Sequence, residues 1–114
     1  MCKFIITLLL CISNICLAQQ ICTDGICVTE FNANFNEKNE VVWLVKLTDC
    51  ETGRVDITTD ANWASKYKIV VVPTLVIFKD GEEVKRFQAN IMMQMEATRK
   101  DVQDAINELI MERF

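Results

Sequence analysis

The chain has 114 residues, enough for one small domain, with a formal net charge of −4 and 51% hydrophobic residues. It contains no His, which excludes Ser–His and Cys–His nucleophilic catalysis and the common His-bearing metal sites, and its three isolated glycines exclude a glycine-rich phosphate loop. An acidic chain without a basic patch is not expected to bind nucleic acid or anionic lipid. The six Cys residues therefore become the first place to look for function.

The N-terminal segment, residues 1–18, has the layout of a secretory signal peptide. Lys3 precedes a short apolar stretch, and small residues close the segment at Ala18. The apolar stretch is too short for a membrane span, so we expect no stable span after cleavage. A lipoprotein signal is the alternative, but neither Cys11 nor Cys16 follows the small residue that such processing favours.

Cleavage of the signal would leave residues 19–114 as one exported domain, periplasmic or secreted. Only Cys22, Cys27 and Cys50 would remain, in a compartment where disulfides form and persist. Asp24-Gly25 predicts a two-residue β-hairpin in which Cys22 faces Cys27 across the strands. We therefore expect a structural Cys22–Cys27 disulfide.

The next segments predict a short helix, two strands and a turn. Phe31 and Phe35 lie four residues apart, as on one edge of a short helix. Residues 41–47 are almost wholly apolar and β-branched or aromatic, which favours a strand covered on both faces. Residues 49–53 predict a turn, and residues 54–58 alternate as in a half-buried strand.

The second half of the chain carries clearer signals. Asp60 can cap a helix over residues 61–67, and a strand is predicted over residues 74–79. Asp80-Gly81 predicts a hairpin turn into an edge strand over residues 82–87.

A C-terminal helix is predicted from a capping box, Thr98-Arg99-Lys100-Asp101. The apolar stripe that follows has the spacing of one buried face: Val102, Ala105, Ile106, Leu109 and Ile110. The order of elements indicates an α/β layer with one sheet.

Ala64, Lys66-Tyr67 and Ile69 lead into residues 72–82, where a lone proline stands between an apolar run and a strand with an Asp-Gly turn. This block, within residues 60–90, resembles the thioredoxin family. The resemblance implies a trimmed thioredoxin-like fold: a central mixed sheet with a C-terminal β-hairpin and a C-terminal helix. It also implies that Pro73 is cis.

In thioredoxins the loop that corresponds to Val72, Pro73 and Thr74 presents backbone to an extended peptide. Thioredoxins also carry Trp-Cys-Gly-Pro-Cys at the end of the central strand, at the start of a long helix. If residues 41–47 are that strand, Cys50 is the candidate nucleophile and Gly53 replaces the second Cys.

The segment around Cys50 departs from the family in charge and in length. Asp49 and Glu51 would raise the pKa of the Cys50 thiol. Too few residues follow for the family's crossover helix, so residues 41–47 and 54–58 either pair as a hairpin or belong to a rewired sheet. A mixed disulfide at Cys50 would have to be resolved by Cys22, by Cys27 or by another protein.

Three hypotheses follow. The first is thiol–disulfide exchange with protein thiols or disulfides through Cys50. The second is a non-catalytic module that binds protein or extended peptide and is stapled by the Cys22–Cys27 disulfide. The third is a copper or zinc carrier that uses sulfur ligands, among them Met92, Met93 and Met95, although Met is also a common core filler. We expect no resident metal and no organic cofactor.

Overall fold

The computed structural model of the chain describes residues 22–60 and 62–112, so the predicted signal peptide lies outside the described residues. Within them, no helix combines the length and the apolar character needed to cross a bilayer. The elements, in chain order, are β1 (Ile26–Asn32), the 3₁₀ helices η2 (Asn34–Asn39) and η3 (Leu44–Lys46), β2 (Glu51–Asp56), α2 (Asn62–Tyr67), β3 (Thr74–Lys79), β4 (Glu82–Gln88) and α3 (Arg99–Met111).

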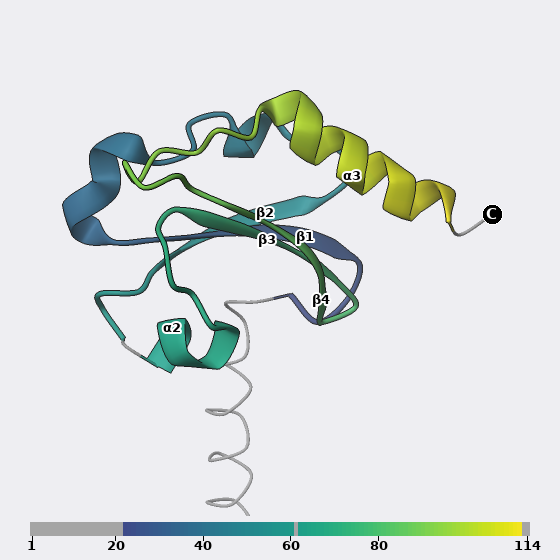
Figure 1. Ribbon diagram of the computed structural model, residues 1–114. Coiled ribbons are helices and arrows are strands. Elements are labelled where there is room, and N and C mark those ends of the chain that lie inside the picture. Colours follow the sequence, from purple (N-terminus) through teal and green to yellow (C-terminus); the bar gives the residue numbers. More distant parts are fainter. Residues whose placement is uncertain (1–21, 61, 113–114) are drawn as a thin grey trace, which may run out of the picture.

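The four strands form one mixed sheet in the order β2-β1-β3-β4. β1 pairs parallel with β2 and antiparallel with β3, and β3 pairs antiparallel with β4. The helix α3 lies over one face of the sheet and α2 lies against the other (Figure 1). The predicted mixed sheet, C-terminal hairpin and C-terminal helix are confirmed.

Each face of the sheet has its own core, because successive side chains of a strand point to opposite faces. On the α3 side, Val28 and Ile77 pack with Ile106. On the α2 side, Phe31 and Phe78 pack around Tyr67, whose ring centroid lies 5.4 Å and 5.5 Å from theirs.

The local signals in the second half of the chain are confirmed. Asp80 and Gly81 have φ values of 52° and 87°, as a tight primed turn between β3 and β4 requires. The N–H of Asn62 donates to the Asp60 carboxylate at the start of α2. Thr98 and Asp101 form both hydrogen bonds of the predicted capping box.

The predicted strand over residues 41–47 is wrong. Val41, Leu44 and Leu47 are buried, whereas Val42 and Val45 are 70% and 66% exposed. Burial at every third residue is the period of a 3₁₀ helix, and η3 lies at the centre of this segment. A short apolar run does not by itself distinguish a strand from a helix.

The strand that takes this central place is β1, and it contains Phe31, for which a short helix was predicted. Residues 33–50 connect β1 to its parallel neighbour β2, which is long enough for a crossover. The crossover is built from η2 and η3, so no α-helix is described in this connection. The predicted alternatives of a hairpin or a rewired sheet therefore fall away.

The predicted hairpin between Cys22 and Cys27 is also wrong, although the disulfide joins the two residues. Cys22 lies outside any strand, and both sides of β1 are occupied by β2 and β3. Gly25 makes the bend with a φ of 74° and donates its N–H to the Asp80 carboxylate. The N-terminal bend is thus attached to the β3–β4 turn.

Candidate functional site

The two ends of the sheet carry different groups. At one end Phe31 is paired with Thr74, and the cis peptide Val72–Pro73 comes directly before it, as predicted. At the other end Cys27 is paired with Glu51, and Cys50 precedes that residue. At about 3.3 Å per residue, roughly 13 Å of strand separates the two pairings.

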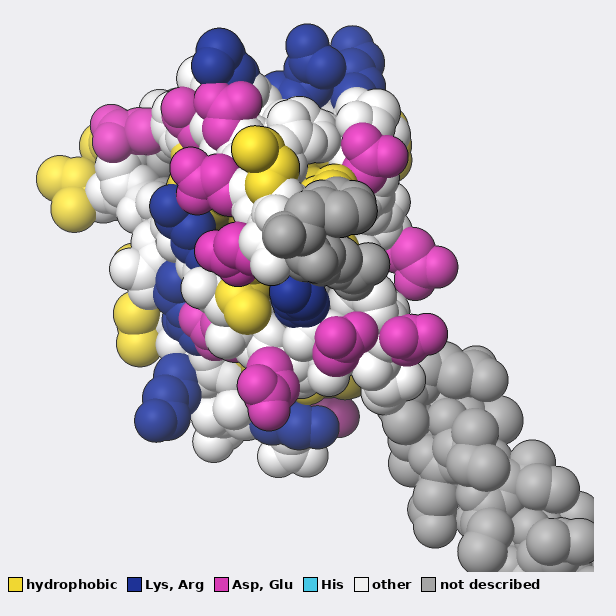
Figure 2. Space-filling model, turned by 90° about the vertical axis from the view of Figure 1, so that its right-hand side faces the viewer, with side chains coloured by type: hydrophobic (Ala, Val, Ile, Leu, Met, Phe, Trp, Pro, Cys, Tyr) yellow, Lys and Arg dark blue, Asp and Glu magenta, His cyan; other side chains and the backbone are white. Residues whose placement is uncertain are grey.

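Cys50 therefore lies at the end of the sheet opposite Pro73. Its predicted position at the family's reactive corner is wrong, because that prediction took residues 41–47 as the central strand. Figure 2 views the end with the β3–β4 turn, where acidic and basic side chains are interspersed and apolar side chains form small separate groups.

The surroundings of Cys50 also disfavour a thiolate. The side chain is half-buried against the α3-side core. Burial, and secondly the charge of Asp49, raise the pKa of the Cys50 thiol. Cys22 and Cys27 pack with the core on the other face of the sheet, so neither is placed to resolve a mixed disulfide at Cys50.

The side chain that faces the cis-proline loop is Asn36, at the end of the crossover's first turn. It is 2% exposed. Its amide nitrogen lies 3.1 Å from the carbonyl oxygen of Met93 and 3.5 Å from that of Val72. Asn36 thus joins η2 to the proline loop and to the segment after β4.

Two further asparagines complete this network. Asn39 donates its side-chain amide to the Asn36 side-chain oxygen at 2.8 Å. Asn32 accepts from the Asn36 amide nitrogen and donates to the Asn36 backbone carbonyl, each at 3.2 Å. Hydrogen bonds on both ends of a buried amide fix its orientation.

An ion pair between the buried Glu30 and the partly exposed Arg54 connects the rest of the crossover to the sheet. The carboxylate of Glu30 is fully buried and accepts from the Val41 N–H at 2.9 Å and from Arg54 Nε at 3.0 Å. Arg54 also donates to the Val41 carbonyl at 2.7 Å. Burial raises the pKa of Glu30, and the bonds from Val41 and Arg54 oppose the shift. A pocket of about 200 Å³ opens beside this pair.

The predicted substrate loop keeps its own side chains inside. Val72, Pro73 and Thr74 are buried, and the Thr74 hydroxyl donates to the Val71 carbonyl at 2.7 Å. No described residue accepts a hydrogen bond from the N–H groups of Val70, Val71 or Val72. The loop therefore offers backbone rather than side chains.

Large apolar side chains are exposed next to each of the three positions that Asn36 connects. Phe35 precedes Asn36 and is 71% exposed, Val70 precedes the proline loop and is 79% exposed, and Ile91 and Met92 precede Met93. We call these four residues the loop patch. Besides Phe35, each of them lies within two positions of Val72 or Met93, whose carbonyls Asn36 contacts, so the patch belongs to the segments that meet at the cis-proline loop.

One group of potential metal ligands occurs among the described residues: Cys22, Cys27 and Glu51, with ligand atoms within 4.8 Å of one another. In this structure the two sulfurs are bonded to each other. The methionines of the predicted copper site have unlike surroundings, because Met95 packs against the α3-side core while Met92 is 66% exposed.

Comparison with known proteins identifies the family. The family model described as Thioredoxin matches residues 29–104. The chain belongs to the thioredoxin family. The thioredoxins of Mycobacterium bovis and Mycobacterium tuberculosis are 39% identical to it over 41 residues, which cover 36% of this chain and 35% of each relative. The match thus spans about a third of these curated relatives.

Solved thioredoxins share the fold. A mutant thioredoxin from Halobacterium salinarum is 27% identical, with a TM-score of 0.59 over 75% of this chain and 74% of that chain. A Schistosoma mansoni thioredoxin is 23% identical, with a TM-score of 0.61 over 84% of this chain and 86% of that one. The likeness to the second shows the fold alone.

With β1 as the central strand, the segment after it stands where thioredoxins carry Trp-Cys-Gly-Pro-Cys. Here that segment reads Phe35-Asn36-Glu37-Lys38-Asn39. The aromatic residue and the spacing are kept, and an asparagine replaces each Cys. This segment is not predicted from the sequence as a functional site because it contains no thiol. The available signal is Phe35 followed by two asparagines three positions apart, Asn36 and Asn39.

Proposed function

We propose that this thioredoxin-family protein binds an extended segment of another protein at the Pro73 loop and does no thiol chemistry there. The observation that carries the proposal is the hydrogen-bonded pair Asn36 and Asn39 in the place of the family's two Cys residues. Thiol–disulfide exchange needs a thiolate, and a carboxamide can neither attack a disulfide nor store two electrons.

The backbone of the loop supports the binding part of the proposal. The N–H groups of Val70, Val71 and Val72 have no acceptor among the described residues. An extended peptide can pair with such groups as an added strand does, and its side chains then contact the surface on either side. The loop patch supplies apolar contact area of the kind that marks interaction sites.

The partners that we infer are proteins that present an extended segment, including segments with thiols or disulfides, as the family implies. Export is part of the same proposal and depends on the signal-like segment 1–18. In a periplasm or outside the cell, extended protein segments are available as clients. N-terminal sequencing of the protein secreted by an expressing cell tests cleavage after Ala18.

The binding proposal is tested by selecting from a phage-displayed library of random peptides on the folded protein and measuring the affinity of the enriched peptides. We expect Pro73→Ala to weaken binding about tenfold or more. Val70→Asp places a charge on an exposed residue of the loop patch and should weaken binding without disturbing the core. Lys100→Ala, exposed on α3, is the matched control and should bind as wild type.

Two outcomes of this selection would contradict the proposal. One is a library that yields no binder, and the other is a set of binders whose affinity is the same for wild type, Pro73→Ala and Val70→Asp. Circular dichroism of each variant shows whether the fold is kept.

Exchange through Cys50 is the competing hypothesis. The raised pKa of its half-buried thiol predicts slow alkylation of the native protein at neutral pH. The measurement is iodoacetamide labelling followed by mass analysis, together with insulin reduction by wild type and by Cys50→Ser. Rapid labelling and insulin reduction that Cys50→Ser abolishes would replace our proposal with this one.

A further inference from the structure

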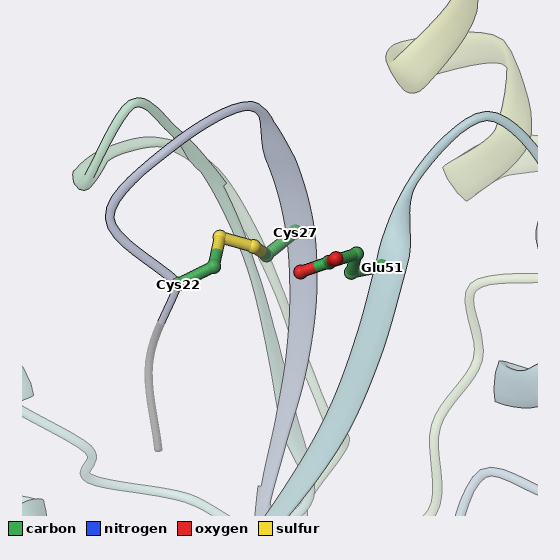
Figure 3. Close-up of side chains that lie close together, drawn as sticks. All are labelled: Cys22, Cys27 and Glu51. Carbon is green, nitrogen blue, oxygen red and sulfur yellow. A yellow bond between two sulfur atoms is a disulfide. The ribbon is translucent and has the colours of Figure 1, made fainter. Parts of the chain in front are cut away.

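The end of the sheet away from the proline loop carries a second group of chemistry-bearing residues. The sulfurs of Cys22 and Cys27 and a carboxylate oxygen of Glu51 lie within 4.8 Å of one another (Figure 3). We propose that Cys22, Cys27 and Glu51 form a redox-gated zinc site, closed when the disulfide is formed and open when it is reduced.

The sheet places these three groups together. Cys27 and Glu51 are paired in register on the adjacent parallel strands β1 and β2. Cys22 precedes β1, and the bend at Gly25 places it beside the strand, with its Cα 6.3 Å from that of Cys27. Two ligands on paired strands and one on a short attached bend are held near one another by the backbone in either redox state.

The distances between the three ligand atoms suit a zinc ion with tetrahedral coordination. Ligand atoms around zinc are about 3.5 to 3.8 Å apart, given Zn–S and Zn–O bonds of about 2.3 and 2.1 Å. The sulfurs must separate after the disulfide breaks, and the Glu51 oxygen must approach them by roughly 1 Å. Both movements are available, because Glu51 is exposed and Cys22 is only partly buried.

The donor set selects the metal. Two thiolates and one carboxylate suit Zn²⁺, which accepts sulfur and oxygen ligands together. Cu(I) prefers ligands that are all soft, and Ca²⁺ and Mg²⁺ require oxygen ligands. Solvent would fill the fourth position. The three ligands carry three negative charges when ionised, and only that of Glu51 is included in the chain's formal net charge of −4, so a divalent cation is electrostatically favoured.

The gate is the two-electron reduction of the disulfide. Two equivalents of a thiol reductant give up two electrons and two protons, the Cys22–Cys27 bond breaks to two thiols, and the reductant becomes a disulfide. Zn²⁺ then displaces one proton from each thiol and binds the two thiolates and the Glu51 carboxylate. In the oxidised protein the two sulfurs are covalently bonded to each other, so no thiolate is available to bind the metal.

This site is independent of the proposed peptide function, because it lies at the opposite end of the sheet from Pro73. It also differs from the predicted carrier with sulfur ligands, because it uses no methionine and includes the carboxylate of Glu51.

The test uses the full chain with serine in place of Cys2, Cys11, Cys16 and Cys50, so that Cys22 and Cys27 are its only thiols. The protein is reduced with a phosphine that does not compete for metal, and Co²⁺ is titrated in as a spectroscopic probe for Zn²⁺. We expect one Co²⁺ per chain with a sulfur-to-cobalt charge-transfer band, displaced by Zn²⁺, and no band in the oxidised protein. Glu51→Gln should weaken Co²⁺ binding at least tenfold, and Cys22→Ser should abolish the band.

Each other result overturns the proposal. A reduced and folded protein without the band has no such site, and equal affinity in Glu51→Gln removes Glu51 from it. Glu82→Gln, a glutamate at the start of β4, is the matched control and should bind as the parent does. If reduction unfolds the chain, recovery of the circular dichroism signal on Zn²⁺ addition supports the site, and no recovery overturns it.

Discussion

At the scale of single residues, the proposed function depends on Asn36 and Asn39, at the proline-loop end of the sheet. The side chains are close enough for a 2.8 Å hydrogen bond, and Asn36 faces the loop that precedes β3. The amides therefore distinguish this segment from the family's Cys pair, and the crossover differs as well, because η2 and η3 stand where the family has a long helix.

This leads to a gain-of-function prediction. In Asn36→Cys with Asn39→Cys, the two introduced thiols should form a disulfide, because the side chains they replace are in contact. The double variant should reduce insulin faster than wild type, whereas Asn36→Cys alone should not. Mass analysis after alkylation detects the bridge; a folded double variant whose new thiols stay free would show that this segment does not hold the geometry of the family's Cys pair.

Glu30 is a buried carboxyl group whose titration should affect stability. Burial raises the pKa of Glu30 in the folded state above 4.5. Between the pKa of the unfolded chain and that of the folded protein, Glu30 is therefore protonated in the folded protein and ionised in the unfolded chain. The resulting stability is fully present below about pH 4.5 and is lost as the pH rises through the folded pKa of Glu30. Glu30→Gln should remove this part of the pH dependence.

Urea unfolding between pH 4 and pH 7 measures this effect. The carboxylate of Glu40, 3.8 Å from Arg54, faces the same ion pair, so Glu40→Gln is the comparison variant. If the pH dependence of the free energy of unfolding disappears in Glu40→Gln and persists in Glu30→Gln, the titrating group is Glu40 and the prediction is wrong.

The wrong placement of Cys50 beside Pro73 has its cause in single residues. A cysteine is an obvious candidate for chemistry in a sequence, whereas an asparagine is not. The hydrogen-bond partners that connect Asn36 to the proline loop and to the segment after β4 lie 36 and 57 residues away in the chain. The same holds for Glu30, whose partner Arg54 is 24 residues away. Long-range partners of this kind cannot be derived from local spacing.

At the scale of elements, the second half of the chain was predictable because its signals are local. The capping box of α3 and the turn of the β3–β4 hairpin are formed by residues within four positions of one another. β1 was missed because its buried faces include Thr29 and Glu30, so it does not have the pattern of an apolar strand. Residues 41–47 do have that pattern, but they form the crossover.

The β3–β4 turn gives a prediction with a control inside the chain. Gly81 has a φ of 87°, and a Cβ there would meet nothing closer than 3.7 Å, so the cost of Gly81→Ala is conformational. We expect a loss of about 1 kcal/mol in the free energy of unfolding. Gly53→Ala, where φ is not positive and space is open, should cause no comparable loss. Equal losses in chemical denaturation would mean that backbone strain does not explain the difference.

At the scale of the whole molecule, the sheet keeps two chemistries apart. Asn36, the proline loop and the loop patch lie where β1 ends and β3 begins, whereas the disulfide, Glu51 and Cys50 lie where β1 and β2 begin. Between these ends β1 and β3 are buried and paired with each other, and α3 and α2 cover the two faces of the sheet (Figure 1). We therefore expect changes at one end to have little effect at the other.

The expected consequence concerns reduction of the Cys22–Cys27 disulfide. A bridge that closes so short a loop should stabilise the fold by about 2 kcal/mol through the entropy of the unfolded chain. Reduction should therefore lower the unfolding midpoint. Peptide affinity at the Pro73 loop should stay within about twofold as long as the protein is folded, because every group proposed to contact the peptide is at the other end of the sheet. Binding isotherms of the oxidised and reduced protein at a temperature well below both midpoints measure this; a large change in affinity without unfolding would show that the two ends of the sheet are coupled.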